Sequence, residues 1–135
     1  MRVEGGCYCG AVRYVAEGDP TMKAQCHCRE CQYITGGSPN VIMGMPASGF
    51  AYTRGAAKGF SRKDLASPAT REFCPECGTH LLTRVPAAPN AVFLKVGGLD
   101  DPSVFGMPQV AIQTADAQAF HRIPEGVASF ERWPG

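Results

Sequence analysis

Short apolar runs, broken by glycine and proline, recur along most of the chain. Residues 10–18 (GAVRYVAEG) alternate apolar and polar positions and lead into a Gly-Asp-Pro turn, a pattern typical of a β-strand. Residues 91–96 (AVFLKV) form the clearest apolar run, and a Gly-Gly pair ends it. The pattern therefore predicts strands joined by tight turns.

Other segments have the same character, and helix is scarce. Further strands are expected at residues 40–45, 50–53, 80–85 and 109–114. One or two helical turns are expected after Cys28, before a Gly-Gly pair. A short capped turn is expected where two aspartates precede Pro102, because proline suits the first helical position. The predicted fold is mainly β, with short strands, many turns and little helix.

Size and composition place this pattern in one small domain. A chain of 135 residues with 44% hydrophobic content fits a single globular domain over residues 1–135. With 16 glycines and 11 prolines the chain is rich in turns, yet below the level typical of disorder. We expect its modest core to need support from bound metal.

Charge and segment lengths exclude several functions. The net charge is +1, and no run of lysine or arginine predicts binding to nucleic acid or to an anionic membrane. No stretch has the length of a membrane span, and the start, MRVEGGCYCG, lacks the apolar core of a signal peptide. A cytoplasmic location is therefore expected.

The cysteines carry the strongest chemical signal. There are seven, an odd number, and a reducing cytoplasm disfavours disulfides. They fall into closely spaced groups: Cys7 and Cys9; Cys26, Cys28 and Cys31; Cys74 and Cys77. Scattered structural thiols would not cluster in this way. The spacing indicates metal ligands, and zinc is the metal that such thiolate sets favour.

The ligands divide most economically into four plus three. The sequence Cys74-Pro-Glu-Cys77-Gly is a zinc knuckle that needs two further ligands, and Cys7 and Cys9 are the remaining close pair. Cys26, Cys28 and Cys31 would then hold a second zinc with one position open to water or substrate. A rival division joins Cys28 and Cys31 to the knuckle as a long-loop zinc ribbon, which leaves three clustered thiols without a role.

The order of these motifs resembles a known family. GGCYCGAVRY, CHCRECQYITGG, FCPECGTHLL and VFLKVGGLDDPS follow one another as in the glutathione-dependent formaldehyde-activating enzymes, a family that includes centromere-protein-V-like members. The likeness continues into SFERWP, with a family core at about residues 3–120 and a tail over residues 121–135. It implies an Mss4-like fold.

The resemblance also implies roles for the cysteines. It assigns a structural zinc to Cys7, Cys9, Cys74 and Cys77, and a catalytic zinc to Cys26, Cys28 and Cys31. The implied reaction joins glutathione and formaldehyde into S-hydroxymethylglutathione, a carbon–sulfur lyase reaction run in reverse. The expected partner is therefore a small-molecule thiol such as glutathione. The alternative is a non-catalytic zinc module that binds a protein or carries zinc, and no motif identifies a glutathione pocket.

The remaining candidates favour structural roles. His27 is expected to point away from the metal, either at the surface or supporting the ligands. His80 is expected to pack near the four-cysteine site, and His121 is expected to be exposed. Tyr33 and Tyr52 are expected in the core rather than in a pocket.

The charged turn of the middle cluster and the single tryptophan complete the candidates. Arg29 and Glu30 lie between Cys28 and Cys31 and are interpreted as solvated charges, although Arg29 could meet a substrate carboxylate. Trp133 is expected to anchor the C-terminal tail.

Overall fold

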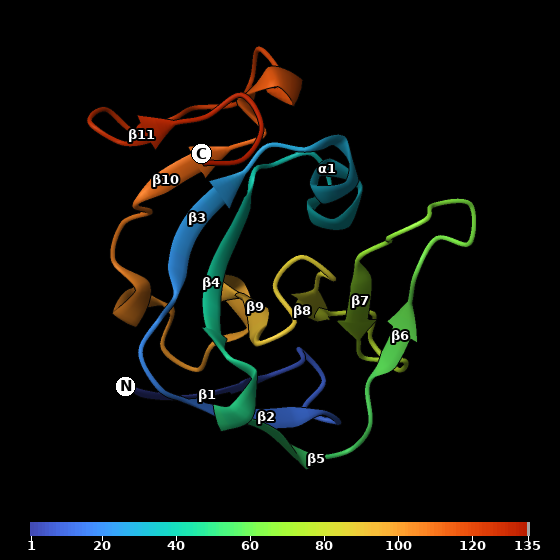
Figure 1. The fold of residues 1–135 in the computed structure, drawn as a ribbon. Coiled ribbons are helices and arrows are strands. Elements are labelled where there is room, and N and C mark those ends of the chain that lie inside the picture. Colours follow the sequence, from blue (N-terminus) through green and yellow to red (C-terminus); the bar gives the residue numbers. More distant parts are fainter. Residues whose placement is uncertain (135) are drawn as a thin grey trace.

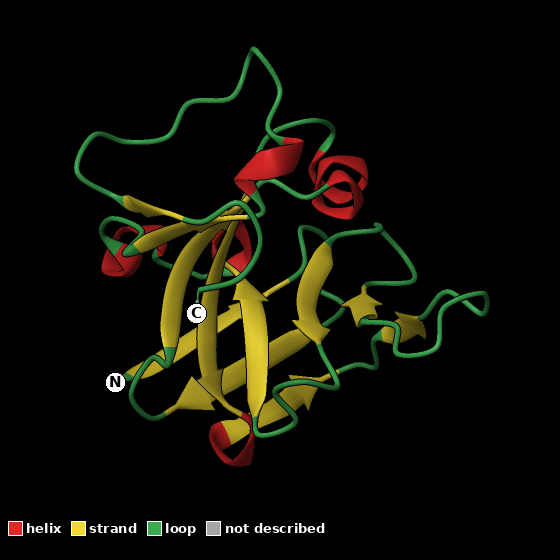
Figure 2. Ribbon diagram, turned by 45° about the horizontal axis from the view of Figure 1, so that its top comes forward, coloured by secondary structure: helices red, strands yellow, loops and turns green. Residues whose placement is uncertain are grey.

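Two β-sheets make up the computed structural model, which describes residues 1–134 (Figures 1 and 2). The smaller sheet has the order β1-β2-β5 and the larger has the order β11-β10-β3-β4-β9-β8-β7-β6. Their strands are β1 (Arg2–Gly6), β2 (Arg13–Glu17), β3 (Met22–Cys26), β4 (Asn40–Pro46), β5 (Phe50–Arg54), β6 (Lys58–Phe60), β7 (Thr70–Phe73), β8 (His80–Arg84), β9 (Ala91–Lys95), β10 (Val110–Ile112) and β11 (Ala128–Ser129).

Helix is limited to short segments within residues 1–134. The α-helix is α1 (Arg29–Thr35), and four 3-10 turns are η1 (Ala47–Gly49), η2 (Val96–Gly98), η3 (Pro102–Phe105) and η4 (Thr114–Asp116). Asp101 caps η3 through its side chain, with Pro102 in the first turn, as the sequence predicts. None of these helices is long or apolar enough to cross a bilayer. The fold is mainly β and is consistent with the expected small Mss4-like fold.

The larger sheet is buried on both faces near its centre. Strand β4 pairs antiparallel with β3 on one side and with β9 on the other. On one face, Met43 and Met45 pack with the apolar side chains of the smaller sheet, which lies across one end of the larger sheet in Figure 1. On the other face, Ile42 and Phe93 belong to a second cluster that includes two of the middle cysteines. Burial on both faces explains why β4 and β9 appear as continuous apolar runs.

The expected strands are present with slightly shifted ends, and five strands were not predicted. The missed strands are β1, β3, β6, β7 and β11. Strand β3 alternates buried Ala24 and Cys26 with more exposed polar residues, but neither buried side chain is a typical strand former. The strand expected at residues 109–114 ends at Ile112, because Gln113 adopts a left-handed backbone with φ of 55°.

Candidate metal centres

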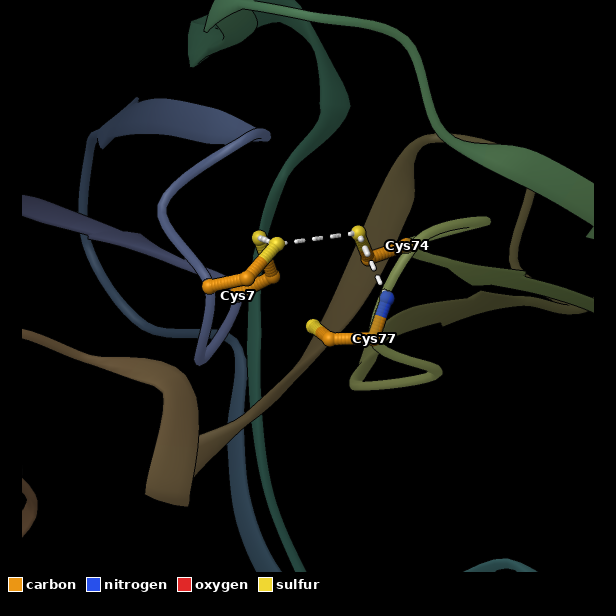
Figure 3. A group of neighbouring side chains, drawn as sticks. Cys7, Cys74 and Cys77 are labelled. Atoms are coloured by element: carbon orange, nitrogen blue, oxygen red, sulfur yellow. Dashed lines mark hydrogen bonds between the residues drawn. The ribbon is translucent and has the colours of Figure 1, made fainter.

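Four cysteines meet where turns of the two sheets approach one another. Cys7 and Cys9 follow β1 of the smaller sheet, whereas Cys74 and Cys77 lie in the turn between β7 and β8 of the larger sheet. Figure 3 shows the side chains of Cys7, Cys74 and Cys77 converging from these two turns. Cys7 and Cys74 are buried, while Cys9 and Cys77 are exposed. The cluster therefore lies at the edge of the core and joins residues far apart in sequence.

The sulfur geometry fits a tetrahedral zinc ion. All four Sγ atoms lie within 4.8 Å of one another. The Sγ atom of Cys9 is 3.7 Å from that of Cys7 and 3.8 Å from that of Cys74. Zinc bonded to four thiolates at about 2.3 Å requires sulfur atoms about 3.8 Å apart. These two distances match tetrahedral coordination of zinc by thiolates.

Backbone and hydroxyl groups support charged sulfurs at this site. The Val12 amide donates to Cys7 Sγ at 3.2 Å, and the Glu76 amide donates to Cys74 Sγ at 3.4 Å. The turn needs the left-handed backbone of Gly78, whose φ is 79°. The Thr79 hydroxyl lies 3.2 Å from Cys77 Sγ, and its hydrogen bond lowers the pKa of that thiol to about 5. Such donors stabilise the thiolates that metal binding requires.

The other three cysteines meet at the start of α1. Cys26 ends β3, Cys28 is the N-cap of the helix, and Cys31 lies in its first turn. Their three Sγ atoms also lie within 4.8 Å of one another. The Cys31 amide donates to Cys28 Sγ at 3.2 Å, which holds the Cys-x-x-Cys segment in its turn. We call these residues the three-cysteine cluster.

One thiol of the three-cysteine cluster is poised to ionise. Hydrogen bonds from the Cys26 and Cys28 thiols, together with one from Asn40, lower the pKa of Cys31 to about 3. The buried Asn40 Nδ2 donates to Cys31 Sγ at 3.4 Å. The neighbouring sulfurs of Cys28 and Cys31, together with burial, raise the pKa of Cys26.

The sulfurs are grouped as four plus three. Cys28 and Cys31 lie with Cys26 and not with the knuckle cysteines, so the ribbon division does not match the geometry. The three-cysteine cluster opens onto a cavity of about 370 Å³. The cavity wall includes Ile42, Phe93, Ile112 and Trp133 as apolar members and Arg29, Glu30, Asn40, Arg71, Thr83, Lys95 and Asp116 as polar or charged members. This volume suits a small ligand.

Sequence reasoning missed three buried polar residues on the cavity wall. Asn40, Thr83 and Lys95 are all buried, on β4, β8 and β9 respectively. Lys95 Nζ donates to Thr83 Oγ1 at 2.6 Å. Burial lowers the pKa of Lys95 to about 8, which leaves the ammonium charged at pH 7. The sequence does contain one signal for these residues, a single lysine inside the apolar run AVFLKV. Lysine is rarely buried without a partner, so its presence there indicates a specific role.

A buried histidine pair corrects one expectation and refines another. His121 is only 7% exposed, so the prediction that it lies at the surface is wrong. Its Nδ1 lies 3.0 Å from Nδ1 of His27, which is fully buried, and its Nε2 lies 2.7 Å from the Gly37 carbonyl oxygen. Since the Gln118 amide also donates to His121 Nδ1, that atom is an acceptor and His27 is the donor. The pair connects the three-cysteine cluster to the C-terminal segment.

The two tyrosines and the tryptophan are all at least partly exposed. Tyr33 is 80% exposed and stacks against Arg29, so its expected place in the core is wrong. Tyr52 is half-buried and donates to Glu72 Oε1 at 2.6 Å. Trp133, within the tail that it was expected to anchor, is half-exposed and lies on the cavity wall.

The remaining candidates are Arg29, Glu30 and His80. Arg29 and Glu30 are exposed, as expected, but Glu30 forms an ion pair of 3.2 Å with Arg71. The ring of His80 packs against Phe73, just before the knuckle.

These features define a small, mainly β protein with two cysteine clusters that fit metal ions. The family described as glutathione-dependent formaldehyde-activating enzyme matches residues 2–116, and the chain belongs to this family. The match includes all seven cysteines.

A solved structure supports the fold independently. The crystal structure of a Rhodobacter sphaeroides protein superposes with a TM-score of 0.62 at 22% sequence identity, covering 78% of this chain and 96% of that chain. At this identity the likeness concerns the fold alone. A search of curated protein sequences gave no match.

Proposed function

We propose that this protein is a zinc-dependent enzyme of the carbon–sulfur lyase type, which acts on an adduct of glutathione or another small thiol. The reaction nearest to the family's description is formation of S-hydroxymethylglutathione from glutathione and formaldehyde. The observation that carries the proposal is the position of the three-cysteine cluster, which opens onto a ligand-sized cavity. A reducing cytoplasm, which keeps thiols free, suits this chemistry.

The two clusters have different proposed roles. Cys7, Cys9, Cys74 and Cys77 supply four ligands and would close a structural zinc site. Cys26, Cys28 and Cys31 supply three and would leave one position for substrate at a catalytic zinc. Zinc held there would lower the pKa of an incoming thiol and keep it as a nucleophilic thiolate. We therefore expect two zinc ions per chain.

The chain's own residues shape this site for addition to a carbonyl. The thiol sulfur forms a bond to the carbonyl carbon, the C=O π electrons move to oxygen, and the proton lost by the thiol ends on that oxygen. Asn40 fixes Cys31 by its hydrogen bond to Sγ. Ile42 and Phe93 are both 7% exposed and give the cavity apolar walls that limit competing water.

The test compares rates, because the adduct also forms spontaneously. Zinc-loaded protein should accelerate exchange between glutathione, formaldehyde and S-hydroxymethylglutathione, followed by exchange NMR. Cys28→Ser should lose the acceleration, since it removes one cluster ligand. As a matched control, Ser48→Cys adds an exposed thiol on η1, outside the cavity wall, and should leave the rate unchanged in the parent background. Equal exchange rates with and without the parent protein would refute this reaction.

The alternative function, a non-catalytic zinc module, makes a different prediction. A module of that kind needs only the four-cysteine site filled and has no reason to bind a small thiol. Calorimetry with glutathione therefore separates the two classes. Thiol binding without acceleration would instead indicate an enzyme whose substrate is another thiol adduct.

A further inference from the structure

Five neighbouring strands bring the cysteine cluster and two cationic side chains onto one face of the larger sheet. Cys26 on β3 pairs with Asn40 on β4, and Ile42 on β4 pairs with Lys95 on β9. Side chains two positions apart on a strand share a face, so Asn40 and Ile42 point to the same side.

The register continues to the far side of the cavity. Thr83 on β8 pairs with Phe93 on β9, and Arg71 on β7 pairs with Thr83. Phe93 and Lys95 are two residues apart and therefore share the face that carries the cysteine cluster. All of these residues line the same cavity. Its floor therefore has sulfur ligands at one end and cations at the other.

Two cations share one hydroxyl acceptor at that end. Thr83 Oγ1 accepts from Lys95 Nζ at 2.6 Å and from Arg71 Nη1 at 3.3 Å. Lys95 is 8% exposed, and the side chain of Arg71 is 14% exposed. Within residues 1–134, Lys95 forms no ion pair with a carboxylate. Arg71 has a single one, with Glu30, whose side chain is 46% exposed.

This arrangement leaves hydrogen-bonding capacity unused. An ammonium has three N–H donors and a guanidinium has five. Buried charges in proteins are normally paired. The neutral Thr83 hydroxyl does not neutralise Lys95, and the carboxylate paired with Arg71 belongs to the half-exposed Glu30. The two groups therefore form a ready site for an anion that enters the cavity. Arginine also presents a planar fork that matches a carboxylate.

We propose that Lys95, Arg71 and Thr83 form a carboxylate-binding subsite, so that the cavity selects thiols which carry a carboxylate. The identification of the bound molecule as a thiol rests on the function proposed above, whereas the anion site rests on the two cations alone. In this arrangement the substrate sulfur lies at the three-cysteine cluster, and its carboxylate lies against β7, β8 and β9. Lys95 and Arg71 are then specificity-determining residues.

The first test compares two thiols that differ in charge. Calorimetry on zinc-loaded protein should give β-mercaptopropionate an affinity about tenfold or more above that of its neutral amide. Lys95→Met should reduce this preference to less than about threefold while retaining the affinity for the amide. Methionine has a similar length and suits a buried position, so this variant should fold. Lys63→Met removes an exposed charge away from the cavity and should leave the preference intact.

Two outcomes would overturn the subsite. Equal affinities of the parent protein for the acid and the amide would show that the carboxylate is not recognised. A Lys95→Met variant that weakens both thiols equally would show that Lys95 acts through the charge of the cysteine cluster and not on the carboxylate. Arg71→Lys provides a second variant, which keeps the positive charge and loses the planar guanidinium group. It should weaken the acid selectively.

A second test does not depend on thiol binding. Propionate has the same carboxylate without the sulfur, and it should cause saturable shifts of the Thr83 and Lys95 amide resonances in zinc-loaded protein. These shifts should be absent in Lys95→Met. If glutathione and both small thiols fail to bind but propionate still does, the proposed function fails and the anion site stands. Absence of the shifts in the parent protein would overturn the site.

Discussion

Lys95 carries a charge at a buried position with little access to water. Its ammonium is buried within the larger sheet and donates to the Thr83 hydroxyl. Burial is the main cause that lowers its pKa from 10.5 to about 8, and the negative charge of the cysteine cluster opposes this change. Burial of the Lys95 ammonium therefore lowers the stability of the folded state. The same ammonium lies on the cavity wall, where the proposed subsite would bind a carboxylate.

Lys95→Met should increase the stability of the protein at neutral pH. Below about pH 8 the folded state must bury the ammonium, whereas from about pH 8 to 10.5 the unfolded chain binds more protons than the folded chain. The parent's stability should therefore rise with pH across this window relative to the variant. The variant's advantage, on the order of 1–3 kcal/mol at pH 7, should shrink as the pH rises. Urea unfolding of both proteins across this range measures the difference. A difference independent of pH would contradict it.

At the scale of elements, the four-cysteine site connects the two sheets. Cys7 and Cys9 follow β1, and Cys74 and Cys77 follow β7, so a shared zinc would join hairpins that belong to different sheets. The three-cysteine cluster instead joins the end of β3 to the start of α1, which are already neighbours in sequence. Loss of a ligand should therefore have different consequences at the two sites.

Cys77→Ser and Cys28→Ser form a matched pair that tests this difference. Cys77→Ser should give insoluble or poorly folded protein, because binding of a structural zinc supplies on the order of 10 kcal/mol of folding free energy. Cys28→Ser should fold and retain about one zinc ion per chain, against two for the parent. Elemental analysis and thermal melting provide the measurements. Native melting of Cys77→Ser, or equal zinc content in Cys28→Ser and the parent, would argue against these roles.

At the scale of the whole molecule, the two sites should respond separately to metal removal. The three-cysteine cluster has fewer ligands and lines a cavity, so a chelator should first remove a zinc bound there and leave the sheets intact. Removal of a zinc from the four-cysteine site should unfold the protein, because binding of a structural zinc there would be coupled to folding. A colorimetric zinc assay combined with circular dichroism follows both steps. Unfolding together with release of the first zinc would contradict the separation.

The cysteine spacing made the three-cysteine cluster predictable from the sequence, whereas the grouping of Cys7 and Cys9 with Cys74 and Cys77 was the more economical of two divisions. Ligands that lie two or three residues apart must bind close together, so Cys26, Cys28 and Cys31 reveal one site without any tertiary information. Strands with long apolar runs, such as β4 and β9, were predictable for a similar reason, because burial on both faces leaves a local signal. Strands β6 and β7 carry no such signal, since none of their residues is buried.

The sequence by itself determined the ligand types, the mainly β class and the division of seven cysteines into neighbouring groups, because these depend on short-range spacing and composition. Only the tertiary structure decided that Cys7 and Cys9 meet Cys74 and Cys77, and that His121 is buried against His27. It also decided where the cavity lies. Arg71, Thr83 and Lys95 come from three strands that pairing brings side by side, and no spacing along the chain encodes that register.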